Sequence, residues 1–532
     1  MNNTSVNDKL YVAFEVVIAI LCVGLITSET IMTISTILLL VIWLLFGFFS
    51  TRSLKGIANQ FKSFISNKAC VIFSLTYVVC LLSLTYSQDV SKGVSELLVK
   101  IPMLIMPLVF SMPIKIKERT VNIAISAFCA TLVYASIYSL AVFFGDPYYD
   151  YRATYPHIST VILGFDLAFG IILLIYTLLR YKHKFKTWMK LLITAAILLF
   201  LTVIFIKKSL TGLVTLLVVS TLLSFTSNTL FEISKRGKKL TFSLVLLITG
   251  VMAGYYIYAH HKYYDLQIDI NNLPKYTANN NLYTHDIERS TLEEGNYDLC
   301  FLCEKELAQE WPKVSGTEYA NHKFTLIRYL NSLGYTKDSV GISRLTKENI
   351  NDIKHGVANI NYKRFGFYPR LSETFFEIER YKKNGCPQGS LTARVGAWVS
   401  GIEAIKQKPL FGYGTGEVVK TQRDMSFKIF PCLEVFHGHD ELRHGILSHN
   451  QYIFFGTQSG IIGLIIIILC FIYPGVIQKK FNSFLWVSIF YSCMIFMMFD
   501  DILGSQAGVT MIVLFYFLFL FYDKEREIPC KR

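Results

Sequence analysis

Four histidines precede the last group of apolar stretches in this sequence, at positions 437, 439, 444 and 449. His449 is the nearest of them to an apolar stretch that starts near residue 450, so it is expected at the membrane–water boundary. An imidazole at that boundary can accept a proton near neutral pH, which makes His449 a candidate general base. A histidine that only hydrogen-bonds is the structural alternative. A metal site is a further alternative, although the spacing fits no familiar zinc pattern and no carboxylate is clearly placed beside it.

Two adjacent lysines, Lys207 and Lys208, mark a tight connection between two other apolar stretches at the same boundary. Cations usually gather on the cytoplasmic side of a membrane, so a pair on the outer side needs a reason. Their side chains either snorkel to lipid headgroups or form an anion site at membrane level. Arg152, in the acidic loop 145–158, is a candidate member of the same anion site.

Charged residues inside the apolar stretches need partners, because a charge in the bilayer interior is costly. Glu96 and Lys100 lie four residues apart, on one face of a helix, and are expected to neutralise each other. Glu15 and Asp166 have no partner nearby in the sequence. Asp166 is expected either to anchor a basic side chain from another helix or to line a polar cavity.

The elements that must position these residues are helices in a membrane. The chain has 532 residues, of which 52% are hydrophobic and 17% are charged, whereas a soluble domain carries about 25% charged residues. A membrane-spanning helix needs about 20 apolar residues. Twelve stretches approach this length: 11–27, 31–49, 69–86, 94–111, 121–144, 159–179, 190–206, 210–226, 240–258, 450–473, 483–499 and 504–521. The sequence therefore predicts an all-α polytopic membrane protein with about 12 transmembrane helices.

The basic residues indicate which side of the membrane each connection occupies. Alternate connections, together with both chain ends, carry 23 Lys and Arg residues, and the opposite short connections carry 4. The positive-inside rule places both termini in the cytoplasm and the long segment 259–448 outside. Most of the formal net charge of +14 therefore faces the cytoplasm, and it gives no support to nucleic-acid binding.

The segment 259–448 is predicted to fold as a large, mainly helical extracytoplasmic domain between the ninth and tenth spans. It separates a membrane domain over 1–258 from a second one over 449–532, which ends in a cytoplasmic tail. We expect Ser372 to cap one of its helices. Apolar residues recur at helical spacing in the segments 319–333 and 391–408. The helix that follows Ser372 is expected over 373–384 and should end at Gly385.

Four cysteines fall in this domain: Cys300, Cys303, Cys386 and Cys432. An oxidising compartment favours one or two disulfides, and four cysteines allow three pairings between which the sequence does not choose. A zinc site with four cysteine ligands would need two close pairs. Cys386 and Cys432 lie 46 residues apart, which disfavours zinc.

A glycine-rich segment, Gly412-Tyr-Gly414-Thr-Gly416, follows the predicted helix 391–408. No strand precedes it, and neither phosphate-loop nor dinucleotide-binding spacing is met, so a flexible turn is the better interpretation. Gly456 and Gly460 lie four residues apart in the tenth span, which indicates close helix packing.

The order and spacing of these motifs resemble the O-antigen ligase / O-antigen polymerase superfamily. Its members have many spans and one large periplasmic loop, which holds an arginine, an aromatic helix and a Pro-Leu-x-Gly-x-Gly turn before a His-Asn-x-Tyr motif and a glycine-rich span. The long insert before the arginine is similar to members from Bacteroidota. The matching segments here are Arg394-Val-Gly-Ala-Trp398, Pro409-Leu-Phe-Gly412-Tyr-Gly414, His449-Asn450-Gln-Tyr452 and Gly460-Ile-Ile-Gly463.

The sequence departs from the family pattern at two places. The family often has Ser-Arg-x-Gly between two middle spans, and here Leu210 stands where the arginine is expected. The adjacent Lys207 and Lys208 could supply that charge. The family's His-Pro near the sixth span is reversed here, as Pro156-His157, so no role is carried over to it.

The resemblance implies a GT-C-like glycosyltransferase of the bacterial inner membrane, with its large domain in the periplasm. Its donor would be a glycan on undecaprenyl diphosphate, moved by direct displacement to a hydroxyl of lipid A-core or a similar acceptor, without a nucleotide, a metal or another cofactor. His449 would be the general base and Arg394 would bind the diphosphate, because a guanidinium pairs bidentately with phosphate oxygens. Further implied substrate-binding residues are Lys207, Lys208, Arg443, Arg152, Asn450, Tyr452 and Trp398.

Several other functions remain open. A polymerase of polysaccharide repeat units or a protein O-oligosaccharyltransferase of the same superfamily would use the same donor chemistry. A glycolipid transporter or flippase would belong to a different class, but transporters usually show paired inverted halves, and no such duplication is found in the sequence. A receptor whose outer domain only recognises a ligand would make His449 dispensable.

Overall fold

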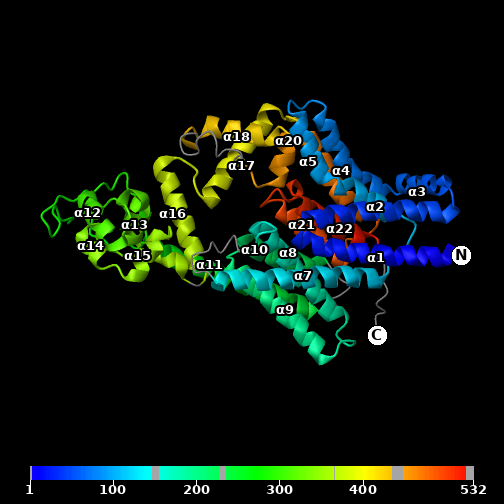
Figure 1. Cartoon of the computed structure of the whole chain (residues 1–532), viewed down its shortest axis with the longest axis horizontal. Helices are drawn as coiled ribbons and strands as arrows, with labels where there is room; N and C mark the ends of the chain where they lie inside the picture. The colour runs from blue at the N-terminus through cyan, green and yellow to red at the C-terminus, as the bar shows by residue number, and fades with distance from the viewer. Residues whose placement is uncertain (1–2, 146–154, 227–234, 365, 434–446, 523–532) are drawn as a thin grey trace. The chain divides into compact units, whose positions relative to one another are not determined.

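The chain is a mostly helical, multi-pass membrane protein (Figure 1). The computed structural model describes all residues except 1–2, 146–154, 227–234, 365, 434–446 and 523–532. Among the described residues, seven helices are long and apolar enough to cross a membrane, or up to eight if one bent pair counts as a span. Each of the twelve predicted stretches coincides with helix in its described part, but a count of twelve spans stays a prediction.

The chain divides into two compact units, which are described one at a time. The first, here called the membrane unit, comprises residues 1–245, 397–429 and 442–532. The second, here called the insert unit, comprises residues 246–396 and 430–441.

The membrane unit is built from helices. Its N-terminal half contains α1 (Asn3–Thr27), α2 (Glu29–Thr51), α3 (Leu54–Ser66), α4 (Lys68–Leu84), α5 (Val90–Lys100), α6 (Pro102–Phe110), α7 (Glu118–Gly145), α8 (Thr160–Arg180), α9 (Thr187–Ile206) and α10 (Leu210–Thr226). Its later helices are α18 (Val418–Ile429), α20 (Gln451–Ile477), α21 (Phe484–Phe496), the short 3-10 turn η3 (Ile502–Gly504) and α22 (Gln506–Leu520). Helix α11 (Lys235–Tyr264) and helix α17 (Ser390–Gln407) each contribute residues to both units.

Among the described residues of the membrane unit, the apolar helices are bent or broken at three places. Helices α3 and α4 meet at a bend of 85°, where the Asn67 side chain accepts a hydrogen bond from the Cys70 N–H and so begins α4. Helices α5 and α6 meet at Pro102, which has no N–H to donate and is favoured in the first turn of a helix. Helix α20 is broken at Gly460, whose φ of 66° and ψ of −174° are not helical.

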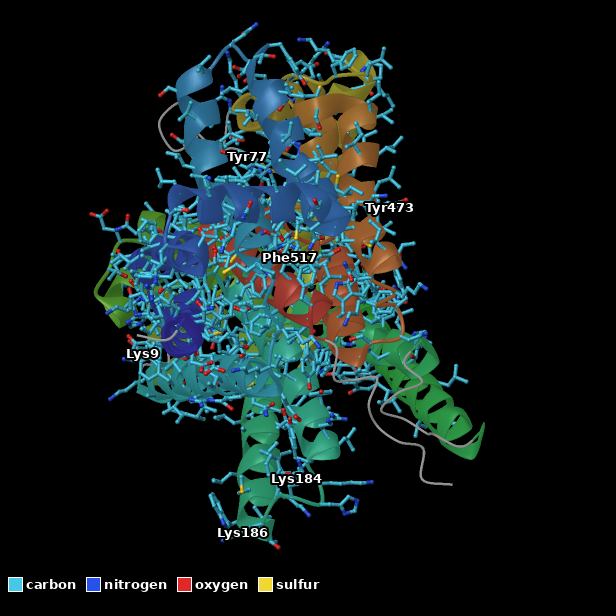
Figure 2. The ribbon with its side chains drawn as sticks, turned by 90° about the vertical axis from the view of Figure 1, so that its right-hand side faces the viewer. Lys9, Tyr77, Lys184, Lys186, Tyr473 and Phe517 are labelled. Atoms are coloured by element: carbon cyan, nitrogen blue, oxygen red, sulfur yellow. A yellow bond between two sulfur atoms is a disulfide. The ribbon has the colours of Figure 1, made fainter. Side chains whose placement is uncertain are left out.

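Helix α22 forms the centre of the membrane unit, because its residues are buried on every side. Phe73 of α4 packs against Phe517 of α22, with ring centroids 4.9 Å apart, and Figure 2 shows Phe517 deep among the helices. Helix α9 instead exposes large apolar side chains, as expected of a surface that faces lipid. Lys184 and Lys186 lie at the tip of the turn between α8 and α9 (Figure 2).

The insert unit has a hydrophobic core of its own and very little strand. Its elements are the hairpin β1 (Leu292–Glu293) and β2 (Asn296–Tyr297), the helices α12 (Glu304–Ser315), α13 (Tyr319–Ser332), α14 (Ser339–Ser343), α15 (Lys347–Lys354) and α16 (Tyr368–Asn384), and the 3-10 turn η1 (Ile360–Lys363). Trp311, Leu326 and Leu330 are fully buried in the core between these helices. Glu294 and Gly295 form the hairpin turn with positive φ values, as a tight two-residue turn requires.

The three predicted helices of this segment exist, with one different start. Helices α13 and α17 match the predicted 319–333 and 391–408 closely. Helix α16 ends at Gly385, as predicted, but it begins at Tyr368 with Pro369 in its first turn. Ser372 is therefore not the N-cap that the sequence suggested; its hydroxyl lies one turn inside the helix and donates to the Glu294 carboxylate at 2.6 Å.

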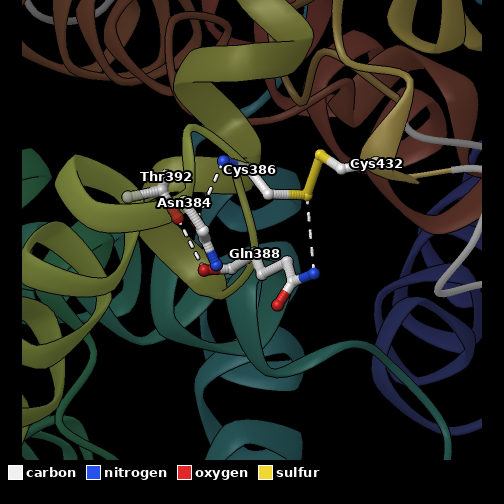
Figure 3. Close-up of a disulfide and its surroundings, with 5 residues drawn as sticks. All are labelled: Asn384, Cys386, Gln388, Thr392 and Cys432. Carbon is white, nitrogen blue, oxygen red and sulfur yellow. Dashed lines mark hydrogen bonds between the residues drawn. A yellow bond between two sulfur atoms is a disulfide. The ribbon is translucent and has the colours of Figure 1, made fainter. Parts of the chain in front are cut away.

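One disulfide joins Cys386 to Cys432 in the insert unit (Figure 3). The Gln388 side-chain amide points at the Cys386 sulfur, 3.5 Å away, and Asn384 accepts a hydrogen bond from the Cys386 N–H. The sequence left three pairings open, and this one is the only disulfide among the described cysteines. Cys300 and Cys303 are buried as free thiols.

Candidate functional site

The chain just before α20 is held in place through its backbone. Gln422 of α18 accepts a hydrogen bond from the Ser448 N–H at 3.0 Å, and the Trp398 indole donates to the Ser448 carbonyl at 2.6 Å. The next residue, His449, has a φ of 44°, which only a few non-glycine residues of this chain share. Asn450 then caps α20 by accepting hydrogen bonds from the N–H groups of Tyr452 and Ile453. These contacts fix where the imidazole of His449 lies.

The imidazole of His449 contacts two aspartates from the segment that follows α21. Its Nδ1 lies 3.0 Å from a carboxylate oxygen of Asp500 and 3.8 Å from one of Asp501. The backbone of this segment is tied to α20, because the Gln451 N–H donates to the Met497 carbonyl and the Gln451 side chain accepts from the Leu503 N–H. The side chain of His449 stays 43% exposed, while both aspartates are mostly buried.

This geometry determines the tautomer of His449. An ionised carboxylate can only accept hydrogen bonds, so Nδ1 is the nitrogen that carries a proton toward Asp500. Among the described residues, Nε2 has no hydrogen-bond partner, and it is therefore the nitrogen that can accept a proton. Asp500 would also stabilise the imidazolium that forms when Nε2 is protonated.

The second carboxylate is under electrostatic strain. Burial and then the neighbouring Asp500 charge raise the pKa of Asp501 to about 6, while His449 opposes the shift. Two adjacent buried carboxylates repel each other, so a cation between them is favoured. The cation can be the protonated imidazole of His449 or a bound metal ion.

The same three side chains could hold a metal ion. Ligand atoms of His449, Asp500 and Asp501 all lie within 4.8 Å of one another. No carboxylate is clearly placed beside His449 in the sequence, and the structure supplies two. A nitrogen and two carboxylate oxygens suit several divalent metals. Metal independence therefore stays a prediction, and the site has two chemically distinct hypotheses.

The glycine-rich segment is built into the break of α20 rather than being a flexible turn. The N–H groups of Tyr413 and Gly414 donate to the carbonyls of Thr457 and Gln458, which lie just before Gly460. The Ile461 N–H donates to the Pro409 carbonyl at 2.8 Å. Backbone groups freed by the break are therefore satisfied by this loop, as membrane helices require.

Glycine is needed at both sides of this contact. A Cβ on Gly460 would lie 2.2 Å from the Leu410 carbonyl oxygen, and one on Gly412 would lie 2.5 Å from the Thr457 carbonyl oxygen. The predicted close packing against another helix is wrong for Gly460, whose partner is this loop. The loop fixes α20 relative to the part of α17 that belongs to the membrane unit. That part of α17 carries Trp398, and His449 lies two residues before the start of α20.

Trp398, Asn450 and Tyr452, which were predicted to bind substrate, make structural contacts around His449. Trp398 donates to Ser448, and Asn450 caps α20 while its amide also donates to the Met498 carbonyl. The hydroxyl of Tyr452 donates to the Met494 carbonyl at 2.8 Å. These contacts position His449 through its neighbours. Binding of substrate by these side chains stays a prediction.

The remaining predicted cations are spread over the chain. Lys207 is buried and Lys208 has a φ of 50°, at the turn between α9 and α10 in the membrane unit. Arg394 is half-buried on α17, in the part of that helix that belongs to the insert unit. Arg152 and Arg443 lie outside the described residues, as do His437, His439 and His444.

The charged side chains inside the predicted spans differ in whether they have a partner of opposite charge. Glu96 and Lys100 form the predicted pair at 4.0 Å, and the Lys100 ammonium also lies 5.5 Å from the Phe454 ring of α20. Glu15 pairs with Arg119 at 3.3 Å, a partner far away in the sequence. Asp166 is buried on α8, and one of its carboxylate oxygens has no hydrogen-bond partner among the described residues.

Sequence reasoning missed Asp500 and Asp501 as site residues. They lie 51 and 52 residues after His449, in the short connection between the predicted spans 483–499 and 504–521. A usable signal did exist. Both the start of the tenth span and the end of the eleventh were predicted on the same side of the membrane, so their polar ends can meet.

The fold and the site define a class, a helical multi-pass membrane protein with a His–Asp pair at the end of a broken span. A scan against protein-family models and a search of curated proteins found no match to this chain.

Proposed function

We propose that this chain is a lipid-linked glycan transferase of the O-antigen ligase type in the bacterial inner membrane. It moves a glycan from undecaprenyl diphosphate to an acceptor hydroxyl, on lipid A-core or a similar molecule, at the periplasmic face. Both termini and the basic turns face the cytoplasm, and the insert unit lies in the periplasm. The proposal uses the predicted count of twelve spans and the GT-C-like arrangement.

The observation that carries the proposal is the hydrogen bond between His449 Nδ1 and Asp500, at 3.0 Å. It leaves Nε2 of an exposed imidazole to take the proton of an acceptor hydroxyl. That proton leaves as the hydroxyl oxygen attacks the anomeric carbon of the donor. The bond from that carbon to the diphosphate breaks in the same displacement, which inverts the anomeric configuration.

The leaving diphosphate needs fixed cations as its negative charge develops. Arg394 is the first candidate, since its guanidinium matches phosphate oxygens bidentately, and Lys207 and Lys208 are further candidates. Arg152 and Arg443 stay predicted members of this set.

A second candidate for the same residues is a divalent cation held by His449, Asp500 and Asp501, which would bind the donor diphosphate directly. In that case the imidazole is a ligand and not the base. The two hypotheses separate on treatment of the purified protein with a strong chelator, followed by elemental analysis. Undiminished transfer after removal of metal supports the general base, and loss that an added metal reverses supports the cation.

A ligase, a polymerase and a protein O-oligosaccharyltransferase differ in the acceptor that receives the glycan. In cells that lack a ligase, polymer accumulates on the carrier lipid, whereas in cells that lack a polymerase, single repeat units are attached to lipid A-core. A protein O-oligosaccharyltransferase would instead leave both glycolipids unchanged and remove glycan from proteins. The glycan profile of a deletion strain, compared with a strain that carries the wild-type chain, tests which acceptor is used.

A further inference from the structure

A cavity lies within the insert unit, at a place to which the proposed transfer reaction assigns no role. Its volume is about 600 Å³. Small-molecule sites commonly measure roughly 300–1,000 Å³. Four chain segments line it: 262–268, 294–301, 332–337 and 360–364.

Hydrogen bonds between these segments make the cavity rigid. The Gln267 N–H donates to the Gly295 carbonyl at 2.9 Å, which ties the first segment to the β1–β2 turn. The Lys337 ammonium donates to the carbonyls of Tyr297 and Cys300, both at 3.0 Å. The Ile360 N–H donates to the Ser332 hydroxyl. The cavity is therefore formed before any ligand arrives, which lowers the entropic cost of binding.

Most charges around the cavity already have partners. The carboxylate of Glu294 accepts from the hydroxyls of Tyr368 and Ser372, at 2.5 and 2.6 Å. The three N–H bonds of Lys337 are used by the two carbonyls and by the Asn331 side chain at 2.6 Å. Lys262 lies over the Tyr368 ring, 4.0 Å from its centre. These charges are therefore not poised to select an ionic ligand.

One polar side chain on the wall of the cavity makes no hydrogen bond with the described residues. The Asn361 residue is only 5% exposed and lines the cavity, yet its side-chain amide makes no hydrogen bond with any described residue. Its backbone N–H and carbonyl are both used within the η1 turn. The amide atoms of Asn361 remain accessible rather than sealed in the interior, so a ligand that enters the cavity can pair with them. An amide offers a donor and an acceptor side by side, and hydroxyl groups match both because each can donate and accept.

Aromatic side chains complete the walls of the cavity. Tyr297, Phe301 and Tyr335 are half-buried there, and each presents an apolar ring face. The lining carries three basic and two acidic side chains, a formal net charge of +1. A ligand with hydroxyl groups and apolar C–H faces fits this combination, whereas a bare phosphate would want unpaired cations.

We propose that this cavity binds a saccharide, recognised by the Asn361 amide and the aromatic walls. The inference that this saccharide belongs to the donor or the acceptor rests on the proposed transferase function. Binding itself is independent of transfer, so the two can fail separately. The insert unit then holds a glycan chain while the membrane unit carries out the reaction.

The test measures binding by the full-length protein in lipid nanodiscs. The probes are oligosaccharides released by mild acid from the lipid-linked glycan of the source cells, inorganic phosphate, and an unrelated peptide of mixed sequence. We expect the oligosaccharides alone to bind. We expect Asn361→Leu to weaken that binding by about tenfold or more, because it keeps the size and removes the amide. Asn321→Leu, at an exposed site on α13, is the matched control and should bind as the wild type does.

Equal binding by Asn361→Leu and the wild type would overturn the proposal, and so would binding of phosphate or peptide in place of glycan. If Asn361→Leu does not fold, hydrogen exchange of the wild type gives the answer. Added glycan should protect amides of 294–301 and 332–337, and unchanged exchange there would also overturn the proposal. The His449→Ala variant should bind the oligosaccharide normally. If His449→Ala loses transfer but still binds the oligosaccharide, binding and transfer occur at two separate sites. If His449→Ala still transfers glycan, the proposed function is contradicted and the proposed binding site is not.

Discussion

The central side chain of the proposed site is His449, and its hydrogen-bond partners indicate which of its ring nitrogens can accept a proton. His449 has its Nδ1 directed at Asp500 and its Nε2 available for a proton, and the backbone around it is fixed by Trp398 and Gln422. The structural alternative, a histidine that only hydrogen-bonds, is satisfied by the Nδ1 bond to Asp500 alone, and it leaves the exposed Nε2 without a use. The pair therefore favours proton transfer over the structural alternative that the sequence left open.

Asp500→Asn is expected to lower kcat by about 10²–10⁴-fold, the range that a positioned proton acceptor contributes. The amide keeps the size of the carboxylate but removes the charge that stabilises the imidazolium. Because Asp500 acts through His449, the KM of the donor should change little, and the pH profile of kcat should shift. Steady-state kinetics over a range of pH values measures both. Asp424→Asn on α18, which is exposed, is the control. An unchanged kcat with an unchanged pH profile would show that Asp500 is only structural.

A second prediction at the scale of residues concerns Glu306 of the insert unit. Burial alone would raise its pKa, but hydrogen bonds from Thr277, Ser339 and Asn281 prevail and lower it to about 2. Because the folded pKa is below the unfolded value of 4.5, the ionised carboxylate stabilises the fold at and above pH 4.5. That contribution is lost as the pH falls from 4.5 toward 2.

Glu306→Gln should therefore lower the free energy of unfolding of the insert unit by about 1.5–3 kcal/mol at pH 7. The difference from the wild type should shrink below pH 4.5. Thermal unfolding of the full-length protein, followed at several pH values, measures it. Glu310→Gln, at a surface ion pair with Lys313, is the control and should cost little. A difference that does not depend on pH would contradict the assigned pKa.

At the scale of elements, the break in helix α20 gives the glycine-rich segment 412–416 a structural role. The loop after α17 fills the break and satisfies the backbone there, so the two segments act as one structural piece of the membrane unit. Gly460 adopts φ and ψ values that are close to exclusive to glycine.

Gly460→Ala should destabilise the protein by more than about 1–3 kcal/mol, because the strained backbone and the contact with the Leu410 carbonyl add up. The fraction of folded protein recovered in detergent and its melting temperature measure the effect. Gly254→Ala, in the helix α11 with open space around it, should be neutral or slightly stabilising. Equal melting temperatures of the two variants would mean that the break at Gly460 does not exist in the membrane.

The helices were largely predictable, and the contacts that form the site were not. Runs of about 20 apolar residues leave few alternatives to a helix, and each predicted stretch is helical. The start of α16 was missed because Pro369 fits the first turn of a helix and Ser372 is used by Glu294. The neighbourhood of His449 and Asp500 depends on how α20 and α21 pack, and nothing local in the sequence encodes that contact.

At the scale of the whole molecule, the charge bias predicts a fixed orientation. Lys184 lies in a basic turn predicted to face the cytoplasm, and Lys305 lies on the insert unit, predicted to face the periplasm. The disulfide between Cys386 and Cys432 agrees with an oxidising compartment for the insert unit.

A membrane-impermeant maleimide should label Lys305→Cys in cells whose outer membrane has been opened. Lys184→Cys should be labelled only after the inner membrane is disrupted as well. Both positions are exposed, so access decides the outcome. Labelling in the reverse order would invert the topology and place His449 on the cytoplasmic side, which is incompatible with the proposed periplasmic reaction.

The most direct test of the central claim is transfer in vitro from a purified undecaprenyl-diphosphate-linked glycan to lipid A-core, by wild-type protein and by His449→Ala in lipid nanodiscs. We predict that the wild type forms the product with an inverted anomeric configuration. His449→Ala, present at the same level and with the same melting temperature, should be slower by about 10²–10⁴-fold. Transfer by His449→Ala at the wild-type rate would contradict the account.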